Sequence, residues 1–527
     1  MNPCQLLSTL LLIGAAAASA HADSFRTVQF LGTAQGSDPM INGLGGVTYT
    51  TYTPNAGVYR AMSEPGGILT TASASGSPAP GLPSGTNISF LGNVFPDSAG
   101  RPGFSAYLTG TGVTSNVNDY AVWSLNNGAP TVAMRLGDQA PGNVPGVTYL
   151  AQSNISPGAF NYNSRGDVTF NAYVTGPGIT SANNRGVWTS QGGTTTQLAQ
   201  LGSQAPGMPS GMVYSEFVNG GMNLAPLNGN GQSLISARTT GPGGATGEGV
   251  WMGGPSGMNL ILQRGDAAPG LPGNTFAAFG GASINNQNHV AFMGYPDGPA
   301  GVSYGLWSGA PGSFSLLAAT TQPAAAAGPG VSFGQIGGPA LSGSDKVAFD
   351  STLTGSGVTT SNDSSVWMYD GSGLKMLIRE GMQAPGFPAG DKMGSVTLND
   401  ALDYAINSAG RVALAATYVD PLNNYHRAIW ESSPSGNLVP VLSEGQTMVV
   451  NGATRTIQFL FTRLGESGLQ DGQFTGFNEN GQIAFVADFT DGTSGEFVFT
   501  PTPVPEPSTW ALLAMGAGAL LFRRRRR

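Results

Sequence analysis

The chain has 527 residues, of which 81 are glycine and 36 are proline, while only 9% carry a charge. Hydrophobic residues still make up 40% and come in short bursts, which excludes a disordered chain and favours many short strands separated by turns. Residues 23–500 contain 16 of the 21 basic and 28 of the 29 acidic side chains, and this net charge of −12 argues against nucleic-acid binding.

The chain begins with a run that is typical of a secretory signal peptide. Residues 10–18 are apolar, and Ala-Ser-Ala at 18–20 and Ala-His-Ala at 20–22 are alternative cleavage sites. No Lys or Arg precedes the apolar core, and a buried N-terminal helix is the alternative reading. Removal of residues 1–22 would take away Cys4, the single cysteine, and with it any disulfide or thiol chemistry. We predict a signal helix over residues 1–22 and export by the Sec machinery.

Tryptophan marks a repeat of about sixty residues along the body of the chain. Six of the seven tryptophans recur at intervals of 65, 63, 56, 60 and 63 residues, in contexts such as GVW and AIW. Tyr59 in GVY and Phe499 in FVF are predicted to extend the series at its two ends. Because the tryptophans recur at a fixed position within apolar strands, we predict that they are core residues. The alternative is that their rings stack on sugars. The six are Trp123, Trp188, Trp251, Trp307, Trp367 and Trp430.

A second marker starts with Asn, Asp or Ser, has Gly in its fourth position and ends in apolar alternation. NSRGDVTF at 163 and NENGQIAF at 478 are clear copies, while Asn288 and Asp345 replace Gly in the copies at 285 and 342. This order favours a type I turn in which the first side chain bonds the turn backbone. The alternation that follows predicts a half-buried strand. The clearest turn residues are Asn163, Gly166, Asn228, Gly231, Asn407, Gly410, Asn478 and Gly481.

A third marker is an Ala-Pro-Gly loop, as in DQAPGNVPG and MQAPGFPAG. The copy expected near 323–330 has decayed to QPAAAAGPG. Acidic residues recur beside these loops and predict solvated carboxylates that accept backbone hydrogen bonds, with a calcium- or sugar-binding ring as the alternative. The loop prolines are Pro80, Pro141, Pro206, Pro269 and Pro385, and the acidic residues are Asp138, Asp266, Glu380 and Glu444.

The three markers together define about four strands in every sixty residues. This spacing is typical of a β-propeller blade. Eight turn markers therefore predict an all-β propeller of seven or eight four-stranded blades over residues 23–500. RTVQFLGT at 26–33 echoes RTIQFLFT at 455–462, which indicates that the N-terminus supplies a strand that closes the ring.

The body of the chain offers few residues for catalysis. Without the signal peptide only His289 and His426 remain, which excludes a His-rich metal site and predicts a surface histidine and a strand-edge histidine. Ser408 and Asp403 lie near His426 in the sequence, but no nucleophile-elbow pattern surrounds them. We predict no catalytic residue, no metal ion and no cofactor.

The chain ends with an apolar run and a cluster of arginines. Residues 508–522 carry no charge, and as a helix they would span about 22 Å, which is less than the roughly 30 Å of a hydrocarbon core. An arginine cluster stays on the cytoplasmic side of a membrane. We therefore predict a C-terminal segment over 501–527 whose apolar helix enters the inner membrane transiently, with the body outside.

The parts of this C-terminal segment occur in a fixed order that resembles the PEP-CTERM sorting signal. They are Val504, Pro505, Glu506, Pro507 and Ser508, then the apolar run, then Arg523, Arg524, Arg525, Arg526 and Arg527. The resemblance implies an exosortase, a membrane transpeptidase of Gram-negative bacteria that make exopolysaccharide. This enzyme would cut near residues 505–507 and leave the body at the cell surface or in the extracellular matrix.

The body, over roughly residues 26–500, resembles the tandem NxxGxxAF repeat proteins, with Asn163, Gly166 and Phe170 among the matching positions. That family carries no reaction that can be transferred to this chain. The sequence therefore predicts a non-catalytic binding or structural component of the exopolysaccharide matrix, with polysaccharide or a matrix protein as partner. The alternative is a secreted propeller enzyme that acts on carbohydrate.

Overall fold

The computed structural model describes residues 24–501 except 55, 151–159, 219–225, 397–402 and 466–474. Residues 27–498 form one compact unit, and the described residues 24–26 and 499–501 belong to a second. In the second unit the rings of Phe25 and Phe499 lie 5.5 Å apart. The predicted signal helix 1–22 and the predicted apolar helix 508–522 lie outside the described residues. Within the described part, no helix is long and apolar enough to cross a membrane.

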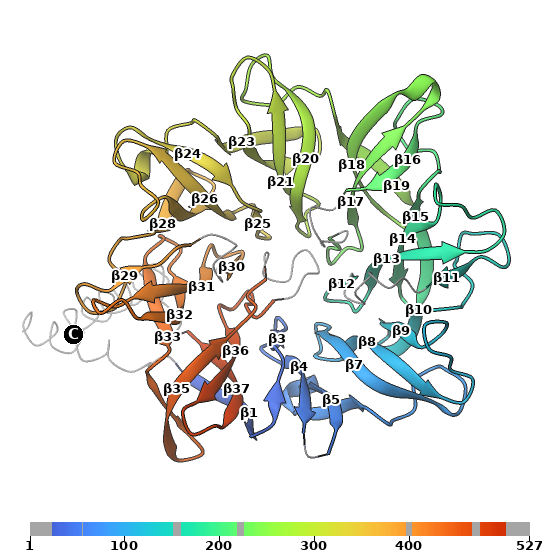
Figure 1. Ribbon diagram of the computed structural model, residues 1–527, viewed down its shortest axis with the longest axis horizontal. Helices are drawn as coiled ribbons and strands as arrows, with labels where there is room; N and C mark the ends of the chain where they lie inside the picture. Colours follow the sequence, from blue (N-terminus) through green and yellow to red (C-terminus); the bar gives the residue numbers. More distant parts are fainter. Residues whose placement is uncertain are drawn as a thin grey trace, which may run out of the picture. The chain divides into compact units, whose positions relative to one another are not determined.

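The described strands form eight sheets, which follow one another around a ring (Figure 1). We number these sheets as blades 1 to 8 in chain order. The fold is an eight-bladed β-propeller, which confirms the predicted all-β class and the upper of the two predicted blade numbers.

Blades 1 to 4 contain the first half of the chain. Blade 1 has β2 (Gln35–Gly36), β3 (Met40–Ile41), β4 (Val47–Thr53), β5 (Val58–Ser63) and β6 (Thr70–Ala74), with the short 3-10 helix η1 (Pro65–Gly67). Blade 2 has β7 (Thr86–Pro96), β8 (Pro102–Gly110), β9 (Tyr120–Asn126) and β10 (Ala129–Arg135). Blade 3 has β11 (Thr148–Leu150), β12 (Phe160–Tyr162), β13 (Val168–Thr175), β14 (Arg185–Gln191) and β15 (Thr194–Gln200). Blade 4 has β16 (Val213–Phe217), β17 (Ser233–Thr240), β18 (Thr246–Gly254) and β19 (Gly257–Gln263), with η3 (Pro242–Gly244).

Blades 5 to 8 contain the second half. Blade 5 has β20 (Thr275–Ile284), β21 (Val290–Asp297), β22 (Gly305–Ala310) and β23 (Ser313–Ala319). Blade 6 has β24 (Val331–Ile336), β25 (Ala340–Leu341), β26 (Val347–Gly355), β27 (Ser364–Tyr369) and β28 (Leu374–Arg379), preceded by η4 (Ala325–Ala327). Blade 7 has β29 (Lys392–Met393), β30 (Asp403–Ile406), β31 (Val412–Val419), β32 (Tyr425–Ser432) and β33 (Leu438–Ser443). Blade 8 has β34 (Thr447–Val450), β35 (Ala453–Phe461), β36 (Ile483–Phe489), β37 (Ser494–Thr500) and β1 (Ser24–Gly32).

Blade 8 is built from both ends of the chain. Its strand order is β1-β37-β36-β35-β34, so β1 holds the position that β10 holds in blade 2. This confirms that the N-terminus supplies the strand that closes the ring. The two segments whose sequences echo each other take different positions, because β1 is a fourth strand and β35 is a first strand.

The NxxG turns explain why the repeat begins with asparagine. In blade 3 the Asn163 Oδ1 atom accepts hydrogen bonds from the backbone N–H groups of Arg165 and Asp167, at 3.0 and 3.1 Å. The side-chain NH₂ group of Asn163 is still able to donate, and its Nδ2 atom donates to the Asn228 carbonyl of blade 4 at 3.0 Å. An amide is both donor and acceptor, so a single buried side chain holds its own turn and the next one.

The same kind of hydrogen bond, from the first side chain of one turn to the next turn, recurs around the ring of blades. Further Nδ2 atoms donate to the first carbonyl of the next turn: Asn228 to Asn285 at 2.8 Å, Asn285 to Ser342 at 3.0 Å, Asn407 to Asn478 at 3.3 Å, Asn478 to Asn42 at 2.9 Å and Asn42 to Asp97 at 3.4 Å. Other groups make the two remaining steps, because Asp97 and Ser342 lack an amide. The Ser98 N–H donates to the Ser164 carbonyl at 2.7 Å, and the Ser344 hydroxyl donates to the Ser408 carbonyl at 2.5 Å. Blade 8 is thereby locked to blade 1.

The fourth turn position requires a left-handed backbone. Gly166 and Gly410 have φ of 81° and 80° there. Asn288 and Asp345 occupy the same position with φ of 64° and 62°, and these residue types tolerate this conformation better than other non-glycine residues. The Asn288 side chain also accepts a hydrogen bond from Asn228 Nδ2 at 2.8 Å, so the departure from glycine adds a contact to the ring.

All six repeat tryptophans are at most 1% exposed, which leaves no ring face available for a sugar. Five of them tie the preceding Ala-Pro-Gly loop to the blade, as when Trp188 Nε1 donates to the Pro141 carbonyl at 2.9 Å. The other four pairs are Trp123 with Pro80, Trp251 with Pro206, Trp307 with Pro269 and Trp430 with Pro385. Trp367 instead donates to Ser365 Oγ, in the blade whose loop has decayed to QPAAAAGPG.

The end members of the tryptophan series differ from the prediction. Trp188 is paired with Phe170 in blade 3, and the equivalent pair in blade 1 is Met62 with Tyr49. In blade 8, Phe497 stacks on Phe485 with ring centroids 5.5 Å apart. Met62 and Phe497 therefore hold the tryptophan position, and the assignments to Tyr59 and Phe499 were wrong. The GVY and FVF patterns mimic GVW in sequence but lie three and two residues out of register.

Candidate functional site

The residues of the predicted sorting signal, 504–508 and 523–527, lie outside the described residues. The propeller carries the other side chains that the sequence suggests for a site, namely the loop carboxylates and the two histidines.

The acidic residues beside the Ala-Pro-Gly loops do not assemble into a metal site. Asp266 and Glu444 accept backbone hydrogen bonds from Gln263 and Arg427, both at 2.9 Å. Glu380 accepts a side-chain hydrogen bond from the Ser364 hydroxyl at 3.0 Å. Burial raises the pKa of the fourth, Asp138. No group of three or more potential metal ligands occurs among the described residues.

The histidines and their sequence neighbours also have separate partners. His289 directly follows the NxxG-type turn of blade 5, and its Nδ1 atom is 2.8 Å from Asp345 Oδ1 in the equivalent turn of blade 6. The His426 ring stacks on Tyr418, 5.0 Å between centroids. Ser408 donates to Glu479, and Asp403 accepts a hydrogen bond from the Leu464 N–H, so these side chains do not form a triad.

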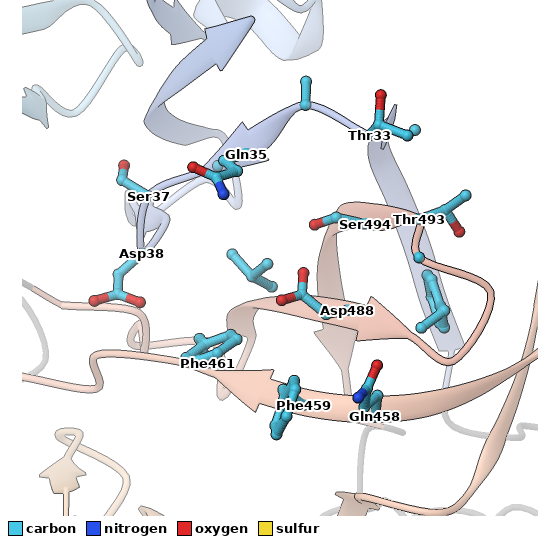
Figure 2. Close-up of a pocket in the computed structure, with 16 residues that line it drawn as sticks. Thr33, Gln35, Ser37, Asp38, Gln458, Phe459, Phe461, Asp488, Thr493 and Ser494 are labelled. Carbon is cyan, nitrogen blue, oxygen red and sulfur yellow. The ribbon is translucent and has the colours of Figure 1, made fainter. Parts of the chain in front are cut away.

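A cavity of about 590 Å³ lies beside blade 8, at the point where the ring closes (Figure 2). Three parts of the chain line it. They are residues 32–38, which run from β1 into β2, then Gln458, Phe459 and Phe461 of β35, and residues of β36 with the turn into β37. The cavity thus depends on the N-terminal strand being in place next to the last sheet.

Two phenylalanines give the cavity an apolar wall. Phe459 is 48% exposed and Phe461 is 43% exposed, and their ring centroids lie 6.3 Å apart. Leu460 between them is buried, because successive side chains of a strand point to opposite faces. Two neighbouring aromatic side chains left on the surface at a cavity are a feature of binding sites rather than of a core.

The lining also includes Ala34, Val486 and Phe489, together with eight polar side chains. The polar side chains are Thr33, Gln35, Ser37, Asp38, Gln458, Asp488, Thr493 and Ser494. Of these, Ser37 and Thr493 already bond Thr50 and Asp491. Asp38 and Asp488 come from different elements and border the same hollow in Figure 2. No Lys, Arg or His occurs among the described residues that line the cavity.

A third carboxyl group lies behind this lining. Glu496 on β37 is 0% exposed, and neither of its carboxyl oxygens has a hydrogen-bond partner among the described residues. A side chain at Gly36, which lines the cavity, would collide with the Glu496 carboxyl. Burial raises the pKa of Glu496 well above its ordinary value, and the negative charges of Asp38 and Asp488 raise it further.

Sequence analysis did not single out these residues, although two signals were present. Glu496 directly precedes Phe497, and the residue before each repeat tryptophan is Val, Leu or Ile in all six copies. A carboxyl group at that position breaks the pattern. The second signal is Phe459 and Phe461 separated by one residue in a strand, which places both rings on one face.

The family comparisons match two parts of the chain. The model of a family of unknown function, DUF7453, matches residues 41–511, and the model of the PEP-CTERM protein-sorting motif matches residues 503–527. The second match confirms the sorting signal recognised in the sequence and marks the protein for export to the cell envelope. The resemblance to the NxxGxxAF proteins stays a prediction. No curated protein matches the chain.

The solved structures that resemble the chain are similar only in fold. The polysaccharide lyase Uly1 is 10% identical, with a TM-score of 0.29, and the match covers 69% of this chain and 94% of the lyase. An ulvan lyase of family PL25 is 9% identical, with a TM-score of 0.31 and coverage of 90% and 96%. A Trypanosoma rangeli sialidase in complex with sialic acid is 10% identical, with a TM-score of 0.26 and coverage of 87% and 73%.

The family model covers the described propeller from β3 onward, and the sorting motif overlaps its last nine residues, 503–511. The chain therefore belongs to the family of unknown function DUF7453 and ends in a PEP-CTERM sorting motif.

Proposed function

We propose that the protein is a non-catalytic, exported component of the exopolysaccharide matrix that binds polysaccharide through the cavity at blade 8. In this proposal an exosortase recognises Pro505, Glu506 and Pro507 while residues 508–522 are held transiently in the inner membrane. The propeller over residues 23–500 then remains at the cell surface or in the matrix.

The observation that carries the proposal is the composition of the cavity lining. Exposed aromatic rings can stack against the C–H faces of a sugar, because the ring face is electron-rich and apolar. The surrounding amides, hydroxyls and carboxylates can bond sugar hydroxyls and fix their orientation. Phe459 and Phe461 supply the rings, and Gln35, Gln458 and Asp488 are among the polar groups beside them.

The alternative, a carbohydrate-active enzyme, draws on the carboxyl groups of the same region. A general acid must reach the leaving group to within hydrogen-bond distance. Glu496 has the raised pKa that such an acid needs, but it is 0% exposed and lies behind Gly36. This burial favours binding over catalysis.

The test is a binding titration with the purified full chain and a panel of soluble oligosaccharides, in which product release is followed in the same samples. The variant Phe459→Ala/Phe461→Ala should weaken binding about tenfold or more, because each ring contributes on the order of 1 kcal/mol or more of buried apolar contact. Phe90→Ala is the matched control, since Phe90 on blade 2 is 40% exposed. It should bind like the unaltered chain.

Three results would contradict the proposal. Equal loss of binding in both variants, or no binding to any glycan, would remove the cavity as the binding site. Turnover of an oligosaccharide that the Phe459→Ala/Phe461→Ala variant abolishes would establish the enzyme instead.

A further inference from the structure

The carboxylates that line the cavity indicate which class of glycan it would bind. Asp38 and Asp488 both line it, and neither makes a hydrogen bond or ion pair with another described residue. Asp38 is exposed and Asp488 is half-buried, so both are available to a bound molecule.

The described basic residue of β35 forms no ion pair with Asp38 or Asp488. Arg455 of β35 has its guanidinium in an ion pair with Asp491 at 3.1 Å, in a hydrogen bond to the Val450 carbonyl at 3.0 Å and over the ring of Phe30. Its Nε atom also donates to the Thr493 hydroxyl of the lining at 3.3 Å, so its charge is shared among these partners. No Lys, Arg or His is itself among the described lining residues.

Glu496 is a second, independent observation. It is a fully buried polar side chain without a hydrogen-bond partner among the described residues, and its carboxyl abuts Gly36 in the cavity wall. In the six tryptophan blades the equivalent residue is apolar, so the fold itself does not require a carboxyl group here. Burial raises the pKa of Glu496, and the negative charges of Asp38 and Asp488 raise it further.

We propose that the cavity binds a glycan that carries free amino groups, such as a de-N-acetylated hexosamine polymer, with its ammonium groups at Asp38 and Asp488. This inference rests on the proposed function, since it names the class of polysaccharide that the same cavity takes. An ammonium group pairs with carboxylates and stacks well beside aromatic faces, whereas a uronate would be repelled.

The experiment compares hexasaccharides of one length at pH 6 with the full chain. They are a glucosamine hexamer, its fully N-acetylated form, a neutral glucose hexamer and a galacturonate hexamer. We expect the amine to bind about tenfold or more tightly than the acetylated form, with this advantage shrinking as salt is raised. The galacturonate hexamer should show no binding.

Variants separate specific contacts from attraction to an acidic protein. Asp488→Asn should lower affinity for the amine about fivefold to tenfold while affinity for the acetylated hexamer changes less than twofold. Asp38→Asn is a second variant on an exposed residue, which guards against misfolding. Glu216→Gln is the control, because Glu216 is exposed on blade 4 and its loss changes the net charge equally. It should leave binding unchanged.

Phe459→Ala/Phe461→Ala keeps every charge and should still lose binding of the amine. Equal affinity for the amine and the acetylated form, tighter binding of galacturonate, or an equal effect of Glu216→Gln would overturn the inference and leave the proposed function standing. Failure of all four hexasaccharides to bind would overturn the proposed function as well.

Discussion

Blade 3 and blade 8 share one plan and differ where the ring closes. In blade 3 a continuous stretch of chain supplies every strand, Val187 and Trp188 fill the centre of the blade, and Trp188 ties down the Pro141 loop. In blade 8 the fourth strand comes from the N-terminus, and Glu496 and Phe497 take the places of Val187 and Trp188.

This difference teaches that the regular positions serve packing and the irregular ones are available for binding. The tryptophans and asparagines that define the repeat are buried and satisfied. The cavity with its exposed phenylalanines and free carboxylates occurs where the repeat pattern fails. Four changes would break or sharpen this comparison, and they follow from the largest expected effect to the smallest.

Removing the tryptophan of blade 3 should have the largest effect. Trp188→Ala leaves a cavity in the blade and should lower the free energy of unfolding by about 3–5 kcal/mol. Trp188→Phe recreates the aromatic residue of blade 8 and should cost about half as much. Chemical denaturation monitored by circular dichroism measures both. A loss below about 1 kcal/mol for Trp188→Ala would contradict a core role.

Breaking the turn that locks blade 8 to blade 1 should come next. Asn478→Ala removes the hydrogen bond to the Asn42 carbonyl and the two that Asn478 Oδ1 accepts from Asn480 and Gln482. Because Asn478 is fully buried, we expect a loss of about 2–4 kcal/mol in the free energy of unfolding.

Blade 2 provides the matched variant for this turn. There Asp97 takes the asparagine position and pairs with Arg101 at 2.7 Å. The double variant Asn478→Asp/Gln482→Arg copies that pair and should recover part of the stability lost in Asn478→Ala. Equal stability of the Asn478→Ala variant and the unaltered chain would show that the hydrogen bond from Asn478 to Asn42 does not stabilise the contact between blade 8 and blade 1.

Replacing Glu496 should stabilise the fold. Glu496→Val restores the residue type of blade 3 and should raise the free energy of unfolding by about 1–3 kcal/mol at pH 8, because a partnerless buried carboxyl is removed. The folded-state pKa of Glu496 is raised, so the folded state holds a proton that the unfolded state releases. Stability of the unaltered chain should therefore fall as pH rises above about 4.5, the unperturbed value.

The measurement for this prediction is thermal unfolding between pH 4 and pH 8. The gain from Glu496→Val should grow as pH rises. Asp350 and Asp403, whose pKa values burial raises to about 6, contribute a slope of the same sign in both proteins and cancel in the difference. A gain that is largest at pH 4 would mean that Glu496 has a partner in the folded state.

The smallest effect separates two tryptophans. Trp188→Phe breaks a bond to the Pro141 loop, whereas Trp367→Phe breaks only a bond to Ser365 two residues away. We expect Trp188→Phe to cost about 1 kcal/mol more, because it also releases the loop carbonyl. Limited proteolysis should cut the 139–146 loop faster in Trp188→Phe and leave the 322–330 loop unchanged in Trp367→Phe. Equal proteolysis would show that the tryptophan does not anchor the loop.

The sequence by itself determined the repeat, its turns and the number of blades to within one. These features are local, because turn chemistry, strand alternation and the tryptophan phase are each fixed within about sixty residues. The sorting motif could be recognised for the same reason, since its parts are contiguous. Tyr59 and Phe499 show the limit of such patterns, because register depends on bulges and pairing that adjacent residues do not reveal.

Only the tertiary structure decided what blade 8 is and what lies beside it. Residues 32–38 and 458–494 are more than four hundred positions apart in the chain, and pairing of β1 with β37 brings them together. The meaning of Asp38, Asp488 and Glu496 as one group depends on that pairing. A cavity formed by the closing of a ring belongs to no single repeat, which is why no local pattern in the chain predicts it.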